Sequence, residues 1–397
     1  MLENIFGSVN IFVFIGIAFL LIFILGHFIE VIRVPWIFSA LVLGALLAIH
    51  NPFSALTNSN EFNLLANLGQ YFLLFVIGFE INLKELKKHT GFILKATSFI
   101  IGAETILGAL LFHFLFHVSW PTSFLLALAF ATVGEAVLTP ILDEFKLINT
   151  RLGQLIIGIG TLDDVVEVAA LMIAIAIIGS TAAAHISGYI VVAALLLLAV
   201  LGFGLSKMKE AGRRFGFANV EYLFLFTIFI LFLFTGIGDI ADSATLGALV
   251  AGISMGTFIP NKRKELIKNE VKAVCYGLFA PLFLFKVGTT LDVQYLIHNP
   301  VLILVIGIAT TLITIIATII ISRKELTIRE AVMAGLGVSV RFSTSTIIFF
   351  VLYQNKLITS DIYSILIATS VVVTFVIPIA FATMVSRWHK PALNVED

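Results

Sequence analysis

Charged residues are scarce in this chain of 397 residues. Asp, Glu, Lys and Arg together make up 12% of it, about half of the roughly 25% that is usual in soluble globular proteins. Hydrophobic residues make up 60%, and the mean hydropathy is +1.10. This composition excludes an ordinary soluble domain and predicts a protein that crosses a membrane many times.

Cysteine and net charge are nearly absent as well. The single cysteine, Cys275, excludes an internal disulfide and a thiolate metal cluster. A net charge of +0 argues against a nucleic-acid partner.

The first apolar segment has no basic leader and no A-x-A cleavage pattern, which favours a spanning helix over a signal peptide. Gly-x-Gly strings lie inside apolar runs without the strand–turn–helix context of a phosphate site, so we expect no nucleotide and no organic cofactor.

Apolar runs long enough to cross a bilayer recur thirteen times, which predicts an all-α polytopic membrane protein with thirteen transmembrane helices. The runs span residues 11–29, 36–49, 64–79, 92–116, 124–142, 152–178, 189–205, 222–234, 240–258, 271–287, 301–321, 331–353 and 362–385. The stretch that follows the last run is short. We therefore expect residues 1–397 to form a single membrane transporter domain without a C-terminal regulatory domain.

The positive charges are distributed unevenly between the predicted loops. Of the 24 lysines and arginines, Lys95, Lys286 and Arg341 fall well inside predicted helices, and Lys356 alone falls in a loop after an even-numbered helix. Lys272 lies in the first turn of the run 271–287 and is counted with the loop that precedes it. The others lie after odd-numbered helices or at the C-terminus. Because cytoplasmic loops are rich in Lys and Arg, we predict a multi-pass protein of the inner (cytoplasmic) membrane, with its N-terminus outside and its C-terminus in the cytoplasm.

Acidic residues interrupt the apolar runs. The sixth run contains Asp163, Asp164 and Glu167 in "GTLDDVVEVAAL", and the fifth contains Glu135. A charged carboxylate at the bilayer centre costs about 2.5 to 3.5 kcal/mol on insertion scales, so these groups must line a wet cavity, pair with bases or hold protons. Asp163 and Glu167 share a helix face, and Asp164 is rotated by about 100°. The adjacent pair favours an ion or proton site, although pairing for helix assembly alone stays open, most of all for Glu167.

Two predicted helices are poor candidates for continuous helices. The run 124–142 contains Thr132 and Glu135 beside a glycine and before a proline, and the run 331–353 contains glycines, Arg341 and a Ser/Thr stretch. They are seven helices apart and so run in opposite directions, as an inverted repeat with two crossed discontinuous helices requires. At such a crossing Arg341 would compensate carbonyl ends and Glu135 would compensate N–H ends. Ordinary kinked helices are the alternative.

Four further polar groups lie within or near the apolar runs. Lys286 either extends to the membrane interface or pairs with an acid of the sixth helix. Glu104 lies midway along the fourth helix, and the sequence identifies no partner for it. His113 and His117 have the i,i+4 spacing of metal ligands, but their position near a helix end favours an interfacial role. No metal other than an alkali cation is expected.

These elements, in this order, resemble the bacterial monovalent cation/proton antiporter-2 family, the Kef-like and NapA-like sodium or potassium–proton antiporters. The resemblance covers nearly the whole chain. The segments that carry it, besides the acid pair, are "GHFIEVIRVPWIFSALVLGALLAIHNP", "LLFVIGFEINLKELKKH", "TLGALVAGISMG" and "PLFLFKVGTTLD". It implies an antiporter, not an enzyme, that exchanges Na⁺, Li⁺ or K⁺ for protons by alternating access. It also implies a homodimer in membrane lipid, with a core of residues 92–178 and 301–385 and a scaffold of the remaining helices.

The resemblance implies roles for individual residues. Asp164 corresponds to the essential carboxylate that takes either a cation or a proton, and Asp163 to the second acid of electrogenic members. Both would be ligands of an alkali cation. Thr132 falls in the first broken helix that completes the site, together with Glu135, and Arg341 falls in the second.

This chain departs from the family pattern in two places. Electrogenic relatives have a lysine in the helix before the second broken one, whereas the run 301–321 contains no base. The Arg-Gly-Glu of Kef-like members is replaced by a sequence that begins with Arg341 and lacks the acid. Lys286 or Arg341 would then pair with Asp163, with Glu167 as a further supporting charge. The number of protons exchanged per cation stays open.

Two other function classes deserve comparison. A passive cation channel would share the acids but would not need two inverted broken helices. An intramembrane aspartyl protease is suggested by "GIGD", which ends at Asp239. However, Asp239 falls in a short outer loop of the predicted topology, and the other signature elements of that group are missing from the sequence.

Overall fold

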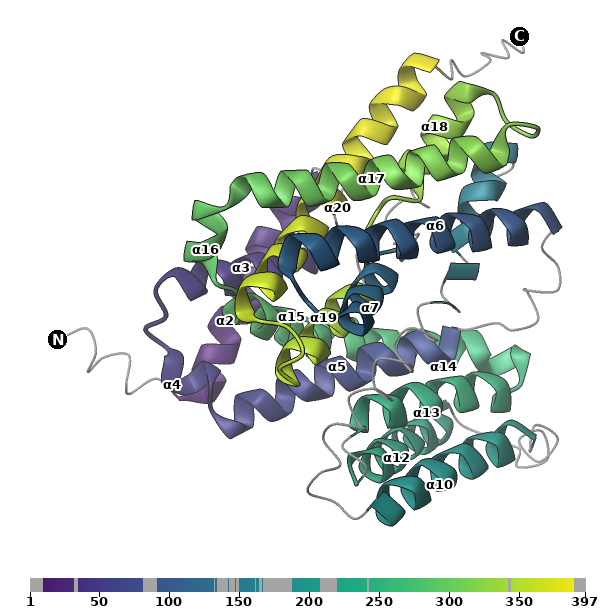
Figure 1. The fold of residues 1–397 in the computed structure, drawn as a ribbon. Helices are drawn as coiled ribbons and strands as arrows, with labels where there is room; N and C mark the ends of the chain where they lie inside the picture. The colour runs from purple at the N-terminus through teal and green to yellow at the C-terminus, as the bar shows by residue number, and fades with distance from the viewer. Residues whose placement is uncertain are drawn as a thin grey trace, which may run out of the picture. The chain divides into compact units, whose positions relative to one another are not determined.

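A computed structural model describes most of the chain, and every regular element in the described part is a helix (Figure 1). The described residues are 10–31, 35–80, 91–131, 133, 142, 147, 150–160, 162–163, 166, 188–207, 220–240, 243–341 and 344–388. Each predicted apolar run contains helix in its described part, which confirms the all-α prediction. Within these residues, seven helices are long and apolar enough to cross a membrane. The total of thirteen spans stays a prediction.

The chain divides into two compact units. Unit 1 comprises Met1–Gly26, Trp36–Leu83 and Met172–Leu291, and unit 2 comprises His27–Pro35, Lys84–Leu171 and Asp292–Asp397. Unit 2 overlaps the two ranges that the sequence analysis assigns to the core. The assignment of core and scaffold roles to the two units stays a prediction.

Unit 1 is built from helices that pack through glycines. Its helices are α2 (Ile11–Val31, in unit 1 as far as Gly26), α3 (Phe38–Ile49), α4 (Ser54–Thr57), α5 (Asn60–Glu80), α10 (Gly188–Lys207), α12 (Val220–Asp239), α13 (Ala244–Phe258), α14 (Asn261–Val274), the π-helix η3 (Cys275–Phe279) and α15 (Ala280–Thr289). Helices α5 and α13 approach so closely that a Cβ at Gly78 would collide with the carbonyl of Leu249, and one at Gly252 with that of Phe75. Small residues at helix interfaces permit this approach in membrane proteins.

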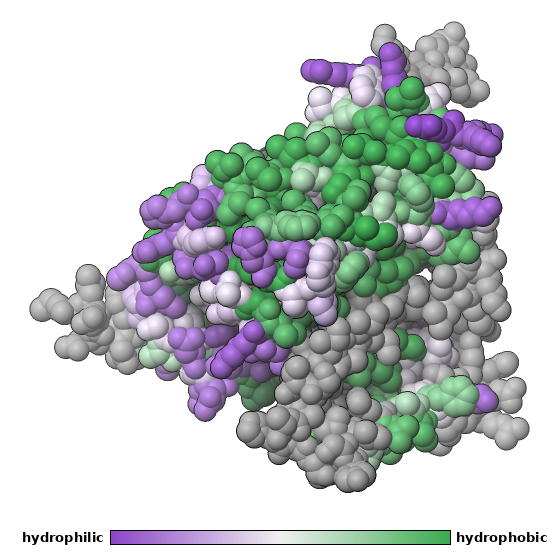
Figure 2. Space-filling model, in the orientation of Figure 1, coloured by the Kyte–Doolittle hydropathy of each residue, from purple (hydrophilic) through white to green (hydrophobic). Residues whose placement is uncertain are grey.

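Unit 2 combines long and short helices. They are α6 (Gly91–Phe116), α7 (Trp120–Phe130), a helix over 151–160, α16 (Val293–His298), α17 (Pro300–Ser322), α18 (Ile328–Gly337), α19 (Thr344–Gln354) and α20 (Ser360–Trp388). α6 packs against α7 and α17, and α17 packs against α18 and α20. The side chains over α17 are mostly apolar, and hydrophilic side chains gather at its two ends, as expected of a membrane-spanning helix (Figure 2).

Two of the unit 2 helices begin at well-formed N-caps. The Ser119 side chain accepts a hydrogen bond from the backbone N–H of Thr122 at the start of α7, where a proline occupies the first turn. Thr327 and Glu330 form a capping box at the start of α18. At about 1.5 Å per residue, α7 and α18 are each about 15 to 17 Å long, roughly half of a hydrocarbon core about 30 Å thick. Both are half-helices.

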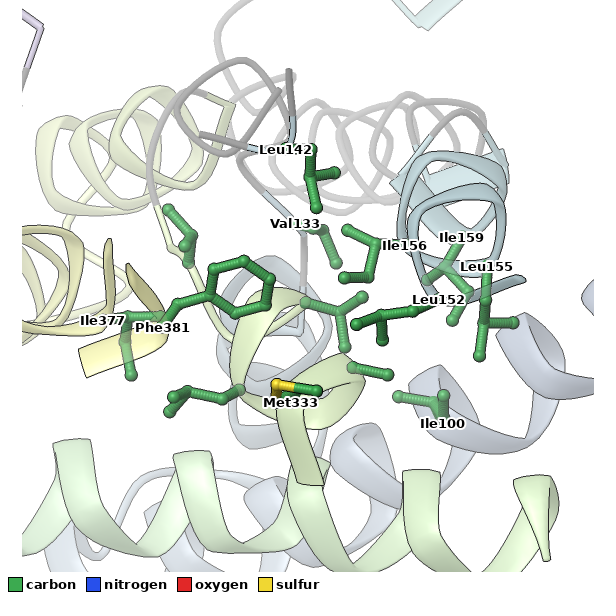
Figure 3. Packing of buried hydrophobic residues seen from close by; sticks show 14 of the residues in the cluster. Ile100, Val133, Leu142, Leu152, Leu155, Ile156, Ile159, Met333, Ile377 and Phe381 are labelled. Carbon is green, nitrogen blue, oxygen red and sulfur yellow. The ribbon is translucent and has the colours of Figure 1, made fainter. Parts of the chain in front are cut away.

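An apolar cluster surrounds the region where these half-helices end. It includes residues from α6, the 151–160 helix, α18 and α20, and Val133 lies among them (Figure 3). Val133 follows the end of α7 and is not helical. The cluster therefore buries the backbone at the interruption that the sequence predicts near Thr132.

Candidate functional site

The first interruption brings a buried acid to the end of a half-helix. α7 ends at Phe130, and the N–H of Ala131 donates to the carbonyls of Ala127 and Leu128. Two residues later, the N–H of Val133 donates to Oδ2 of Asp163. Asp163 has no exposed surface. Its carboxylate thus receives an N–H that the end of the helix has released.

This contact has a simple physical cause. A backbone N–H freed inside the hydrocarbon region must find a partner within the protein, and a carboxylate is a strong acceptor for it. Asp163 thus compensates the N–H of Val133. The sequence predicts the same role for Glu135, which lies outside the described residues. A buried carboxylate can accept a proton, and its oxygens can coordinate a small cation.

The second interruption contains a buried arginine. α18 ends at Gly337, the backbone over 338–341 is not helical, and α19 begins at Thr344. The Arg341 side chain is 1% exposed. Its backbone carbonyl accepts a hydrogen bond from Oγ1 of Thr374 at 2.9 Å, which attaches the interruption to α20.

Arg341 is the partner of Glu104, the mid-helix acid for which the sequence identifies none. Nη2 of Arg341 lies 2.9 Å from Oε1 of Glu104, and Nη1 lies 3.1 Å from Oε2. Nη2 also donates to Oγ1 of Thr314 at 2.7 Å, and that hydroxyl lies against Glu104. The ion pair therefore ties α6 and α17 to the interruption between α18 and α19. Only the similar depth of the two residues could have suggested this pair from the sequence.

The two interruptions are neighbours in unit 2. The guanidinium carbon of Arg341 lies 5.8 Å from the ring centroid of Phe130, the last residue of α7, within reach of a cation–π interaction. The rings of Phe130 and Phe349 lie 6.0 Å apart, so the end of α7 also contacts α19. Beside the ion pair is a cavity of about 10 Å³, which is about the space of one water molecule.

Lys286, the other candidate base, is bound elsewhere. Its Nζ donates to the carbonyl of Thr57 at 2.8 Å and to Oδ1 of Asn58 at 3.2 Å. Both partners belong to unit 1 and lie just before α5. The sequence leaves two arrangements open for this lysine, extension to the membrane interface or pairing with an acid of the sixth helix. The two hydrogen bonds that Nζ donates here are to Thr57 and Asn58 and not to such an acid, and an interfacial position stays a prediction.

Several predicted site residues lie outside the described residues, namely Thr132, Glu135, Asp164 and Glu167. Their positions stay predictions. His113 is described: its ring stacks on Trp120 at a centroid distance of 4.0 Å, and its Nδ1 lies 2.7 Å from the carbonyl of Val118. Within the described residues, no cluster of three or more His, Cys, Asp or Glu side chains is arranged to hold a metal ion.

Known proteins share this sequence pattern and fold. The family model described as "Sodium/hydrogen exchanger, transmembrane" matches residues 15–387. The chain is 24% identical over 382 residues to a probable Na⁺/H⁺ antiporter 3 of Methanocaldococcus jannaschii, covering 94% of this chain and 97% of that protein. It is also 24% identical over 300 residues to the glutathione-regulated potassium-efflux system protein KefC of Escherichia coli O45:K1, covering 71% of this chain and 46% of KefC.

A solved structure has the same fold. The sodium–proton antiporter MjNhaP1 of Methanocaldococcus jannaschii, determined at pH 8, superposes with a TM-score of 0.60. The superposition covers 95% of this chain and 96% of that one, at 15% sequence identity. At this identity the likeness concerns the fold, and the role of each residue has to be argued from this chain's own geometry.

Proposed function

Because the chain belongs to the transmembrane sodium/hydrogen exchanger family, we propose that it is a secondary antiporter that exchanges an alkali cation for protons by alternating access. The observation that carries the proposal is the buried carboxylate of Asp163 at the end of the half-helix α7. The neighbouring Asp164, which follows it in the sequence, is proposed as the carboxylate that takes either ion.

Competition for one site couples the two ions. Burial disfavours a charged carboxylate and so favours its protonated form, whereas nearby positive charge favours the ionised form. Between these influences, a carboxyl can release a proton on one side of the membrane and accept a cation there. Because both ions need the same oxygens, the carrier crosses with one or the other. Asp164, Asp163 and Thr132 would supply hard oxygen ligands, which suit Na⁺, Li⁺ or K⁺.

Glu104 and Arg341 are proposed to hold the second interruption in place. Together they are electrically neutral, and both are buried. They can therefore move with the ion site through the membrane at little electrostatic cost. Their contacts with α6, α17 and Phe130 support a positioning role next to the acids. Glu135 and Glu167 remain proposed supporting charges, while the hydrogen bonds of Lys286 support a role within unit 1.

The division into two units supports a carrier with a core and a scaffold. We propose that unit 2 carries the ion site across the barrier and that unit 1 forms the scaffold of a homodimer. The topology proposed from the loop charges places the protein in the inner membrane, with the C-terminus in the cytoplasm. The KefC relative keeps K⁺ among the candidate cations, alongside Na⁺ and Li⁺.

The test is transport in proteoliposomes that contain a pH dye, with a series of alkali chlorides and a clamped membrane potential. The wild type should move protons in response to a cation gradient and drive cation flux uphill when a pH gradient is imposed. Asp164→Asn should abolish this exchange while the protein stays folded. Full exchange by Asp164→Asn would refute the role of that acid, and flux that only follows the cation's own gradient would indicate a passive channel.

A second variant separates the roles of the two acids. Asp163→Asn should lose exchange or change the charge moved per cycle, because the amide cannot carry the negative charge that the Val133 N–H now faces. The reversal potential measures that charge. An unchanged rate together with an unchanged reversal potential would show that Asp163 serves only the structure of the helix end.

A further inference from the structure

Unit 2 contains a cleft that shares no lining residue with the small cavity beside Glu104 and Arg341. Its volume is about 410 Å³. It lies between α6, α7 and the segment that carries Asp163. The lining residues are Leu94, Thr97, Ser98, Ile101, Gly102, Thr105, Ile106, Leu128, Leu162 and Val166. Most of these side chains are apolar, so the cleft suits a hydrocarbon occupant.

The cleft is open at the surface of α6. Leu94 is 51% exposed and Ile106 is 57% exposed, at the two ends of the stretch of α6 that lines it. Gly102 lies between them, and a Cβ added there would meet no atom within 4 Å. The hydroxyl of Thr97 is already bound to the carbonyl of Ile93, and that of Thr105 is buried. Apart from the exposed Ser98 hydroxyl, the open part of the cleft is therefore lined by apolar groups.

The length and position of the cleft match one leaflet of a bilayer. The stretch from Leu94 to Ile106 rises about 18 Å at about 1.5 Å per residue, and half of a hydrocarbon core about 30 Å thick is about 15 Å. The cleft starts one turn after the beginning of α6 at Gly91. The loop charges predict that this end is cytoplasmic, so the cleft would lie in the inner leaflet.

A lysine directly follows Leu94, the first residue of α6 that lines the cleft. Lys95 is exposed and lies at the predicted cytoplasmic end of α6. It shares a helix face with Ser98 and Gly102, three and seven residues further along. The Ser98 hydroxyl is about 4.5 Å deeper than Lys95 along the helix axis. Along α6 the order is therefore a cation, then a hydroxyl, then an apolar cleft. A phospholipid has the matching order of an anionic phosphate, then ester oxygens, then an acyl chain.

We propose that this cleft binds one anionic phospholipid of the inner leaflet, with an acyl chain along Gly102, its ester oxygens at Ser98 and its phosphate at Lys95. Leu162 and Val166, which line the cleft, flank Asp163 in the sequence. A bound chain therefore packs against the segment that carries the buried acid, and its presence is coupled to the position of that segment.

The binding test uses native mass spectrometry of protein exposed to phosphatidylglycerol or phosphatidylcholine. Gly102→Leu fills the cleft and should remove one tightly retained phosphatidylglycerol per chain relative to the wild type. Lys95→Gln should lower the preference for phosphatidylglycerol over phosphatidylcholine about five-fold, which corresponds to about 1 kcal/mol for one lysine near a membrane surface. Ser98→Leu fills the same cleft and serves if Gly102→Leu does not fold.

The matched control is Gly16→Leu. Gly16 is an exposed glycine of α2 where a Cβ also meets nothing within 4 Å, and this variant should retain lipid as the wild type does. Retention of the same number of lipids by folded Gly102→Leu would overturn the cleft as the site. An unchanged lipid preference in Lys95→Gln would overturn the assignment of the headgroup.

The transport consequence rests on the proposed antiport, whereas the retention measurement does not. The rate of cation/proton exchange by the wild type should differ between liposomes with and without phosphatidylglycerol. The rate for Gly102→Leu should be the same in both. Loss of retention without any exchange in the wild type would leave the lipid site standing and contradict the antiport.

Discussion

Two glutamates with basic partners, one in each unit, show how differently charge is used in this protein. In unit 1, Glu80 at the end of α5 lies 2.6 Å from Nζ of Lys272 and 3.2 Å from Nζ of Lys268, and these side chains are 27 to 34% exposed. In unit 2, Glu104 and Arg341 are 5% and 1% exposed. The first pair is near water and fastens α14 to α5. The second is sealed inside the helices that surround the candidate ion site.

The difference follows from the cost of burying charge. In a partly exposed pair the charged groups keep much of their hydration, so their attraction contributes only about 0 to 1 kcal/mol to the stability of the folded state. A buried pair has lost its water, so each charge depends on the other, and removing one partner costs about 3 to 5 kcal/mol. Unit 1 can therefore lose a charge of Glu80 or its lysines at little cost, whereas unit 2 cannot lose Glu104 or Arg341 singly.

The largest effect on stability is expected from Arg341→Gln. It leaves Glu104 buried without its cation, and the folded state should lose about 3 to 5 kcal/mol. A thermal or denaturant unfolding curve in detergent measures this loss. The double variant Glu104→Gln with Arg341→Gln removes both charges and should recover much of the stability. If the double variant were as unstable as the single one, the ion pair would not be the cause.

Glycine packing in unit 1 should give an intermediate effect. Gly252→Leu places a side chain against the carbonyl of Phe75, and overpacking of this kind costs about 1 to 3 kcal/mol. The control Gly236→Leu changes a glycine of α12 that has open space around it and should be nearly neutral. The same unfolding assay applies. Equal stabilities of the two variants would contradict the close approach of α5 and α13.

The smallest effect is expected from Glu80→Gln. Because the pair is partly exposed, its loss should cost less than about 1 kcal/mol, and the cost should shrink further as salt is raised. Unfolding curves at low and high salt test both statements. A loss as large as that of Arg341→Gln would mean that the two pairs do not differ in the way proposed.

The sequence predicts the helices well because the length of an apolar run and the number of Lys and Arg residues in a loop are local properties. The break between α18 and α19 within a single apolar run was also predictable, and so was the end of α7 at Phe130, before Thr132. The reason is that glycine, proline and polar residues weaken a helix wherever they occur.

The pairing of side chains was not predictable in the same way. Glu104 and Arg341 lie 237 residues apart, and nothing in either local sequence specifies the other. The hydrogen bond from Val133 to Asp163 depends on how the 151–160 helix continues past the end of α7. The π-helix Cys275–Phe279 also has no signal in the apolar pattern, because one extra residue per turn does not alter hydropathy. Such features depend on tertiary packing.

The most direct test of the account asks whether a cation displaces protons from the aspartates. Purified protein in weakly buffered detergent solution is mixed with NaCl, LiCl or KCl, and proton release is followed with a pH dye, using choline chloride to control for ionic strength. The wild type should release protons along a saturating curve with at least one of these cations, and the double variant Asp163→Asn with Asp164→Asn should release none. Equal release by both proteins, or no release by the folded wild type over a wide pH range, would contradict the shared carboxylate site.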